Sequence, residues 1–317
     1  MSAGLVYYGD DQPGIARLRH GRGFTYRGPD GTTIARGPER KRLEALAVPP
    51  AYEDVWISPL ENGHLQATGK DTRARKQYRY HELWSEQQAR AKFDALPLFG
   101  AALPRMRRRI RKDLGEDEGT QRFALAAAAA LMDRMALRVG NPEYARENGS
   151  YGALTLTRKH LKLSGNSIKL DYTAKGGKRV RRSLSDRTLA RALHAAADLP
   201  GATLLSWTES GAPASINSGT LNDYLREISG EEETTAKTFR TWAGTVAAFE
   251  VASAGDATIK AMSEAAADRL KNTPTIARNS YIHPDVIALA GTQPDLPEAD
   301  PIRDLRTSET QLLAFLT

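Results

Sequence analysis

The sequence predicts an α+β protein. A small β-rich N-terminal domain is expected over residues 1–88 and a mainly helical domain over residues 89–317, with a three-stranded antiparallel sheet inserted among the helices. Up to about residue 85, short aromatic and β-branched segments alternate with Gly, Pro and Asn turns, which is typical of strands. Beyond Glu86 the apolar residues recur at helical spacing, except over residues 152–184, where alternation returns.

Two hairpins are expected in the N-terminal domain. Residues 21–35 (GRGFTYRGPDGTTIA) place aromatic and β-branched residues around a Gly-Pro-Asp-Gly turn. Residues 55–58 and 64–68 form a second pair of short strands, separated by Pro-Leu-Glu-Asn-Gly.

The helical domain is predicted from amphipathic segments with clear ends. Within residues 121–137, Phe123, Leu131 and Met135 fall on one helical face together with small alanines. The Gly-Asn-Pro sequence at 140–142 cannot continue that helix. Further helices are expected over residues 187–197, 219–228, 235–254, 258–270 and 273–282, and a short last helix after the Pro-rich segment 294–301.

The inserted sheet is predicted from three alternating segments. These are residues 152–158, 167–172 and 179–184. Turn sequences at 164–166 (Ser-Gly-Asn) and at 176–177 (Gly-Gly) would connect them as antiparallel neighbours.

Composition excludes several classes of protein. The 317 residues include no cysteine, which rules out disulfide frameworks, cysteine-ligated zinc and thiol nucleophiles. The chain has no apolar run of about 18 residues, and its start lacks the layout of a signal peptide. We therefore expect a soluble, cytoplasmic protein that does not enter a membrane.

The positive charge is concentrated in three runs. The formal net charge of the chain is +7. Each run contains five or six basic residues, and the three runs together contain a single acidic residue; they are residues 70–79, 105–112 and 175–182. A single run of this kind is usually solvated surface. Three together, one of them interleaved with Tyr78 and Tyr80, favour a nucleic-acid partner.

Motifs for the common cofactors are missing. The sequence contains no Walker A loop, no HExxH and no GxSxG, and its six histidines have no metal-ligand spacing. We expect neither a cofactor nor a metal. An enzyme that cuts a phosphodiester without a metal needs protein cations to neutralise the transition state, often together with a side-chain nucleophile.

Five residues supply such a set. Arg138 follows the end of a helix, Lys175 lies at a hairpin tip beside two glycines, and Arg240 lies on a helix in the sequence KTFR. Asn272 precedes Thr-Pro at a helix start, and Tyr281 follows nine residues later. Taken alone, each has an ordinary structural explanation: surface charge, a turn, a helix cap or a half-buried ring. Their joint order gives them weight.

That order resembles the type IB DNA topoisomerases, particularly the compact poxvirus-like bacterial group. The matching pattern is Arg, hairpin Lys, KxxR, then Asn-Thr-Pro with a Tyr nine residues on. Residues 69–81 (GKDTRARKQYRYH) also resemble the N-terminal DNA-contacting motif of that group. The resemblance covers most of the chain and is weakest over the first ~20 residues and beyond about Asp285.

The resemblance implies a monomeric, two-domain, C-shaped clamp around double-stranded DNA in the bacterial nucleoid. Tyr281 would attack a backbone phosphate, form a 3′-phosphotyrosyl bond and later be displaced, without ATP or metal. Arg138 and Arg240 would hold the nonbridging oxygens, and Lys175 would protonate the leaving 5′-oxygen. Many relatives have His where Asn272 stands; an amide donates equally well to an oxygen but cannot carry a proton.

The resemblance also implies DNA contacts outside the catalytic set. We expect an extended strand in the major groove, in which Gln and Tyr touch base edges while basic residues contact phosphates. The alternative is a plain strand with an aromatic pair. The candidate DNA-binding residues are Lys70, Arg73, Lys76, Gln77, Tyr78, Arg79, Tyr80 and Lys237.

Two other functions compete with this interpretation. A tyrosine recombinase or integrase shares the Arg, Lys, Arg, Tyr chemistry. However, its second box is HxxR, whereas this chain has Lys237-Thr-Phe-Arg240, and its N-terminal domain is usually helical. An architectural DNA-binding protein would use the basic runs without cutting, and would leave the ordered motifs unexplained.

Overall fold

The computed structural model describes residues 4–317 and divides into two compact units, one ending at Ala91 and the other spanning Lys92–Thr317. The division falls within a helix, α2 (Glu82–Asp94), three residues beyond the boundary expected at 88. The residues on either side of the expected boundary therefore belong to one continuous helix.

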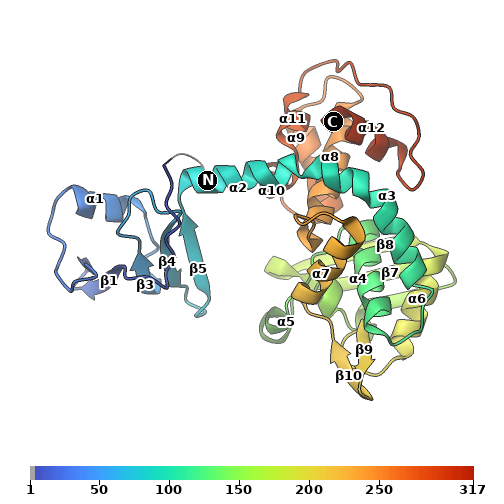
Figure 1. The fold of residues 1–317 in the computed structure, drawn as a ribbon, viewed down its shortest axis with the longest axis horizontal. Coiled ribbons are helices and arrows are strands. Elements are labelled where there is room, and N and C mark those ends of the chain that lie inside the picture. The colour runs from blue at the N-terminus through green and yellow to red at the C-terminus, as the bar shows by residue number, and fades with distance from the viewer. Residues whose placement is uncertain (1–3) are drawn as a thin grey trace. The chain divides into compact units, whose positions relative to one another are not determined.

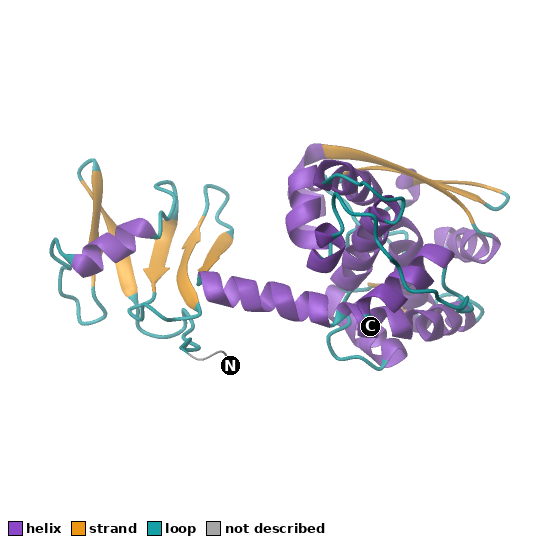
Figure 2. Ribbon diagram, turned by 90° about the horizontal axis from the view of Figure 1, so that it is seen from above, coloured by secondary structure: helices purple, strands orange, loops and turns teal. Residues whose placement is uncertain are grey.

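The first unit is built on a five-stranded antiparallel sheet in the order β2-β1-β3-β4-β5 (Figures 1 and 2). Helix α1 (Pro38–Ala45) buries Leu43 among Ile15, Val55 and Ile57 of the sheet. β5 lies at one edge. The strands are β1 (Ile15–His20), β2 (Gly23–Arg27), β3 (Glu53–Ile57), β4 (Leu65–Lys70) and β5 (Lys76–Tyr80).

One predicted hairpin is correct and the other is misplaced. β3 and β4 pair as expected from residues 55–58 and 64–68. The hairpin predicted over residues 21–35 turns instead at residues 21–22, where Gly21 has φ 56° and β1 pairs with β2. The Gly-Pro-Asp-Gly turn follows β2 and reaches only an isolated bridge at Thr33. The turn was misplaced because the partner of β2 is β1, whose sequence lacks the alternation that would have predicted a strand.

The second unit is mainly helical and surrounds the alanine-rich helix α4. Residues 124–130 of α4 are buried on every side, because methyl side chains let α3, α6, α7 and α8 approach closely. The helices are α3 (Leu96–Asp113), α4 (Gln121–Met135), α5 (Pro142–Asn148), α6 (Arg187–Asp198), α7 (Ser218–Ser229), α8 (Ala236–Ala252), α9 (Ile259–Leu270), α10 (Pro274–Tyr281), α11 (Pro284–Ala288) and α12 (Thr307–Leu316).

The inserted three-stranded antiparallel sheet is confirmed, with one strand corrected. It contains β6 (Leu161–Ser164), β7 (Ser167–Ala174) and β8 (Lys178–Ser185). Residues 152–158, predicted as its first strand, instead include the short 3₁₀ turn Ala153–Thr155. Residues 153–156 are all buried, so they have no solvent face of the kind that their alternation suggested. A small hairpin of β9 (Ser206–Glu209) and β10 (Ala212–Ser215) was not predicted.

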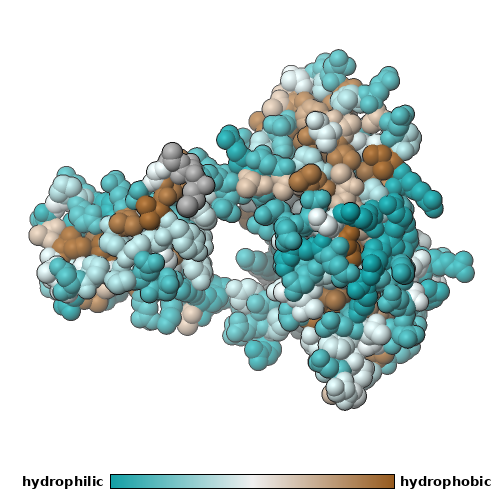
Figure 3. Space-filling model, viewed as in Figure 1, coloured by the Kyte–Doolittle hydropathy of each residue, from teal (hydrophilic) through white to brown (hydrophobic). Residues whose placement is uncertain are grey.

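The face of the protein that Figure 3 shows is mostly polar. In the view of Figure 3 hydrophilic residues cover most of each unit, and hydrophobic ones are interspersed among them. Over the described residues, no helix combines the length and apolar character that a membrane span requires.

Candidate active site

Arg138 is positioned by the sharp end of α4. Ala136 caps that helix in the left-handed conformation with φ 52°, which turns the chain toward the 3₁₀ segment after Gly152. There the backbone N–H of Ala153 donates to the carbonyl of Arg138 at 2.8 Å. A Cβ atom on Gly152 would lie 2.5 Å from that carbonyl, so only glycine permits the contact. Gly152 supports the site and was not identified from the sequence.

Asn272 lies at the junction of α9 and α10 but is not a helix cap. Thr273 caps α10 with its own hydroxyl, so the Asn272 side chain is free to face Arg138. Arg138 Nη2 donates to Asn272 Oδ1 at 3.1 Å. Because a guanidinium can only donate, the amide nitrogen must point away from it. That Nδ2 is buried and has no acceptor within residues 4–317.

Arg240 is buried between the ends of two helices. Its side chain extends from α8, is 4% exposed, and donates from Nη1 to the carbonyl of Ala136 and from Nη2 to that of Leu270 at 3.1 Å. The Nε–H has no partner in the described structure. Burial, with repulsion from Arg138, lowers the pKa of Arg240 to about 10, against the opposing attraction of Tyr281. The guanidinium is still charged at neutral pH.

Tyr281 ends α10 and lies half-buried beside Arg240. The Arg240 Cζ atom is 5.2 Å from the centre of the tyrosine ring. Gly244 on α8 makes this approach possible, because a Cβ atom there would lie 2.7 Å from the Tyr281 carbonyl oxygen. Thr245 donates to that same carbonyl at 3.2 Å. The structure therefore brings Tyr281, Arg240, Arg138 and Asn272 together.

Lys175 is not part of this cluster. It occupies the tip between β7 and β8, where Gly176 and Gly177 have φ 78° and 73°, and its side chain is exposed. In the described part of the chain, no hydrogen bond or ion pair joins it to the other four residues. Lys237, the DNA-contact candidate on α8, is also exposed.

Two further residues border the cluster and were missed. Tyr172 on β7 is buried, and burial raises its pKa although Arg182, Arg240 and Arg138 attract the ionised form. Lys92 donates from Nζ to the Ser280 carbonyl at 2.9 Å, next to Tyr281. Burial, with repulsion from Lys237, lowers the pKa of Lys92 to about 8. Tyr172 lies on the inward face of the alternating strand, which is the one sequence signal that could have identified it.

The candidate DNA contacts of the first unit lie on and beside the edge strand β5. Lys76, Tyr78, Arg79 and Tyr80 are exposed, and the rings of Tyr78 and Tyr80 stack with centroids 6.1 Å apart. Strand alternation places Lys76 on their face and puts Gln77 and Arg79 on the other.

The remaining candidates of this unit surround the turn from β4 to β5. Lys70 pairs with Asp54 at 2.7 Å on the surface. In the turn, Asp71 accepts the backbone N–H of Arg73 at 2.9 Å and the Gln77 amide at 3.2 Å.

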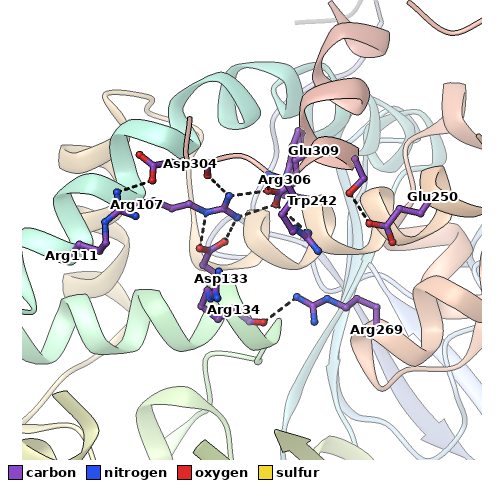
Figure 4. A network of polar contacts seen from close by, with 11 residues as sticks. Arg107, Arg111, Asp133, Arg134, Trp242, Glu250, Arg269, Asp304, Arg306 and Glu309 are labelled. Atoms are coloured by element: carbon purple, nitrogen blue, oxygen red, sulfur yellow. Dashed lines mark hydrogen bonds and ion pairs between the residues drawn. The ribbon is translucent and has the colours of Figure 1, made fainter. Parts of the chain in front are cut away.

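The basic run at residues 105–112 has a structural role instead. Arg107 pairs with Asp133 and with Glu309 of α12, both at 2.8 Å (Figure 4). Glu309 also accepts from Trp242 of α8 at 3.3 Å. Arg111 pairs with Asp304 at 2.8 Å. The arginines of this run are thus largely paired within the unit, where they fix α12 behind the helix that carries Arg240.

Chemically, the cluster suits an oxyanion next to a nucleophile. The guanidinium of Arg240 lies beside the Tyr281 ring, and that of Arg138 is hydrogen-bonded to Asn272. Donors of this kind stabilise a phosphoryl group as charge develops on its oxygens. Within residues 4–317, no group of three or more His, Asp or Glu side chains is placed to hold a metal ion.

Comparison with known proteins identifies the family. Residues 75–275 match the model of the eukaryotic DNA topoisomerase I catalytic core, and residues 23–71 match the bacterial DNA topoisomerase IB N-terminal domain. The DNA topoisomerase 1B of Acanthamoeba polyphaga mimivirus is 29% identical over 234 residues, covering 72% of this chain and 69% of the relative. The vaccinia virus (strain Copenhagen) DNA topoisomerase 1B is 27% identical over 125 residues, and the monkeypox virus DNA topoisomerase I is 24% identical over 124. Each of these two alignments spans 39% of both chains. Because the catalytic-core match extends over more than half of the 317 residues, the chain belongs to the type IB DNA topoisomerases.

Proposed function

We propose that this enzyme relaxes supercoiled duplex DNA by cutting one strand through a 3′-phosphotyrosyl intermediate at Tyr281 and then resealing it. One observation carries the proposal: Tyr281, Arg240, Arg138 and Asn272 meet, although the hydrogen-bonded pair Arg138 and Asn272 are 134 residues apart in the sequence. The enzyme works as a monomer on nucleoid DNA and needs neither ATP nor a metal.

In the first step, the phenol of Tyr281 loses its proton to solvent, its oxygen attacks the phosphorus, and the bond to the 5′-oxygen breaks. The free donors of the cluster are the Arg240 Nε–H and the Asn272 amide N–H, and Arg138 has further N–H groups beyond its bond to Asn272. These donors bind the nonbridging oxygens and neutralise the charge that develops on them. Toward the phosphate, Asn272 can only donate a hydrogen bond from its amide nitrogen, because an amide does not act as a proton carrier near neutral pH.

Lys175 supplies the proton that the departing 5′-oxygen takes up. Its exposed position at a glycine-containing tip is consistent with a side chain that reaches the DNA only when the duplex is bound. In the second step the 5′-hydroxyl attacks the phosphotyrosine and returns its proton to Lys175, the bond to the Tyr281 oxygen breaks, and the released phenolate takes up a proton from solvent. One phosphodiester bond is exchanged for another in each step, so no external energy is required.

The first unit completes the grip on DNA. With Lys237 on α8, the exposed side chains of β5 and its turn contact the duplex, so that the two units close as a C-shaped clamp. Stacked tyrosines flanked by lysine and arginine suit a groove in which base edges and phosphates lie side by side.

A plasmid assay tests the proposal. The wild-type enzyme is expected to relax supercoiled plasmid in EDTA without ATP, and Tyr281→Phe to abolish relaxation while DNA binding persists. Tyr151→Phe is the matched control, because Tyr151 is also half-buried and its ring contact with His160, at 4.3 Å between centroids, survives the change. Full relaxation by Tyr281→Phe would exclude Tyr281 as the nucleophile. A requirement for paired DNA sites would indicate a recombinase instead.

A second variant tests the oxyanion contacts. Loss of one transition-state donor typically slows an enzyme about 10²–10³-fold. Arg240→Ala is expected to lower the single-turnover cleavage rate at least that much, because the change also leaves the carbonyls of Ala136 and Leu270 without their donor. A cleavage rate close to that of the wild type would remove Arg240 from the site.

A further inference from the structure

The end of α9, which precedes Asn272, depends on two arginine side chains. A helix leaves its last four carbonyl groups without helical partners. At α9 the first two of these accept backbone N–H groups of Lys271 and Asn272. The last two accept from side chains instead: the carbonyl of Arg269 accepts from Arg182, and that of Leu270 accepts from Arg240. Cations are also favoured there by the negative end of the helix dipole.

Arg182 comes from the strand that leads away from Lys175. It lies on β8, paired with Leu170 of β7, and the same two strands meet at Ala174 and Lys178 just below the Lys175 tip. Alternation turns Val180, Arg182 and Leu184 inward, whereas Arg181 is exposed. An arginine between two apolar inward positions is not needed for sheet packing. Burial and the neighbouring Arg269 lower its pKa, and its Nε–H is buried without an acceptor in the described residues.

We propose that Arg182 is a positioning residue that fixes the β7–β8 hairpin, and with it Lys175, to the end of α9 that carries Asn272. This inference rests on the proposed role of Lys175 as the proton donor. Arg182 itself does not touch the phosphate. It sets the distance between the proton donor on the hairpin and the oxyanion donors on the helices.

Loss of Arg182 should affect the hairpin more than the helix end. The end of α9 keeps its bond to Arg240 and its backbone cap. The hairpin ends in an exposed, glycine-containing tip, and the Arg182 side chain joins it to α9 by donating to the Arg269 carbonyl. Arg182→Met should therefore weaken proton delivery to the 5′-oxygen while the oxyanion contacts persist.

Single-turnover cleavage of two DNA substrates separates these effects. One is an ordinary duplex and the other carries sulfur in place of the bridging 5′-oxygen at the cleavage site. A thiol is far more acidic than an alcohol, so the sulfur leaves without protonation. We expect Arg182→Met to slow the ordinary duplex at least tenfold and the sulfur-containing duplex less than threefold, as for Lys175→Ala. Arg181→Met, on the opposite face of the same strand with a surface ion pair to Asp171, should cleave both at wild-type rates.

The outcomes that overturn the inference are specific. Equal slowing of Arg182→Met on both substrates would mean that Arg182 acts on the phosphate contacts, and normal cleavage of both would mean that it positions nothing. Thermal unfolding checks that the variant folds. If it does not, Arg182→Lys keeps the charge but loses the planar guanidinium. This variant must also slow cleavage of the ordinary duplex more than that of the sulfur-containing duplex, by a smaller factor than expected for Arg182→Met. Failure of the proposed function would show separately, as cleavage by Tyr281→Phe or lack of sulfur rescue in Lys175→Ala.

Discussion

Replacement of Thr245 by valine tests how the chain around Tyr281 is held. Thr245 is fully buried on α8, and its hydroxyl makes two hydrogen bonds. It donates to the carbonyl of Tyr281 at 3.2 Å and accepts from the backbone N–H of His283 at 3.1 Å. Valine has nearly the same shape, so Thr245→Val leaves no cavity and removes both bonds.

The size of the effect follows from those two bonds. A buried donor or acceptor left without a partner costs about 1–3 kcal/mol, so the loss of both bonds in Thr245→Val should lower the free energy of unfolding by about 2–6 kcal/mol. Urea denaturation measures this. Cleavage on bound DNA should slow about tenfold or more, since misplacement of a reacting group by about 1 Å can cost 10²-fold in rate.

Thr241 provides the control. It lies one turn earlier on the same helix and is equally buried, but its hydroxyl has no partner among the described residues. Thr241→Val should therefore be neutral or stabilising, because a buried hydroxyl without a hydrogen bond is costly. The same substitution should thus have opposite effects one helical turn apart. Equal effects in the two variants, or a neutral Thr245→Val, would refute the reasoning.

Three further predictions concern the second unit. Gly244→Ala should destabilise the protein and slow cleavage, because the added Cβ atom would lie 2.7 Å from the Tyr281 carbonyl oxygen. Overpacking of this kind costs about 1–3 kcal/mol and outweighs the gain of about 1 kcal/mol in helix propensity. An unchanged free energy of unfolding and an unchanged cleavage rate would contradict this prediction. Burial raises the pKa of Glu309, but the attraction of Arg107 and Arg306 outweighs burial and lowers the pKa to about 2. The ionised carboxylate therefore stabilises the folded protein above pH 4.5, and this contribution is lost as the pH falls toward 2. In urea titrations, Glu309→Gln should have a free energy of unfolding about 3 kcal/mol below that of the wild type at pH 7 and equal to it near pH 2. Lys92 has a pKa of about 8 in the folded protein, against an ordinary value of 10.5. Between these two pH values the folded protein binds fewer protons than the unfolded chain, so the free energy of unfolding of the wild type should rise from pH 8 to pH 10.5 relative to that of Lys92→Met. Identical pH profiles for the two proteins would argue against burial of this ammonium group.

Most helices could be predicted because their determinants are local. The alanine-rich repeat of α4 and the glycine and proline that follow it define that helix within a few residues of its observed end. Residues 152–158 failed for the opposite reason. Their alternation is that of a strand, but the backbone N–H groups of Ala153 and Leu154 pair with the chain that follows α4. Partners contributed by another segment decided that structure.

The candidate site shows the same division. The motif order pointed to Arg138, Arg240, Asn272 and Tyr281, and these four residues lie together. The sequence interpretation considered Asn272 as the cap of α10, whereas Thr273, which directly precedes Pro274, caps it and leaves the Asn272 amide nitrogen without a partner among the described residues. Nor did it show that the basic run at residues 105–112 would be largely paired inside the unit, since the acids that neutralise it lie up to 202 residues away.

By itself, the sequence determined the division into a β-rich and a mainly helical part, the family and the chemical groups available at the candidate site, because these depend on side chains a few residues apart and on the order of short motifs. Only the tertiary structure decided which groups meet. Arg240 joins carbonyls that are 104 and 30 residues away from it in the chain, and Arg182 reaches one that is 87 residues away. Such bonds between a side chain and a distant backbone form only after the helices have packed and excluded the water that would otherwise satisfy both partners.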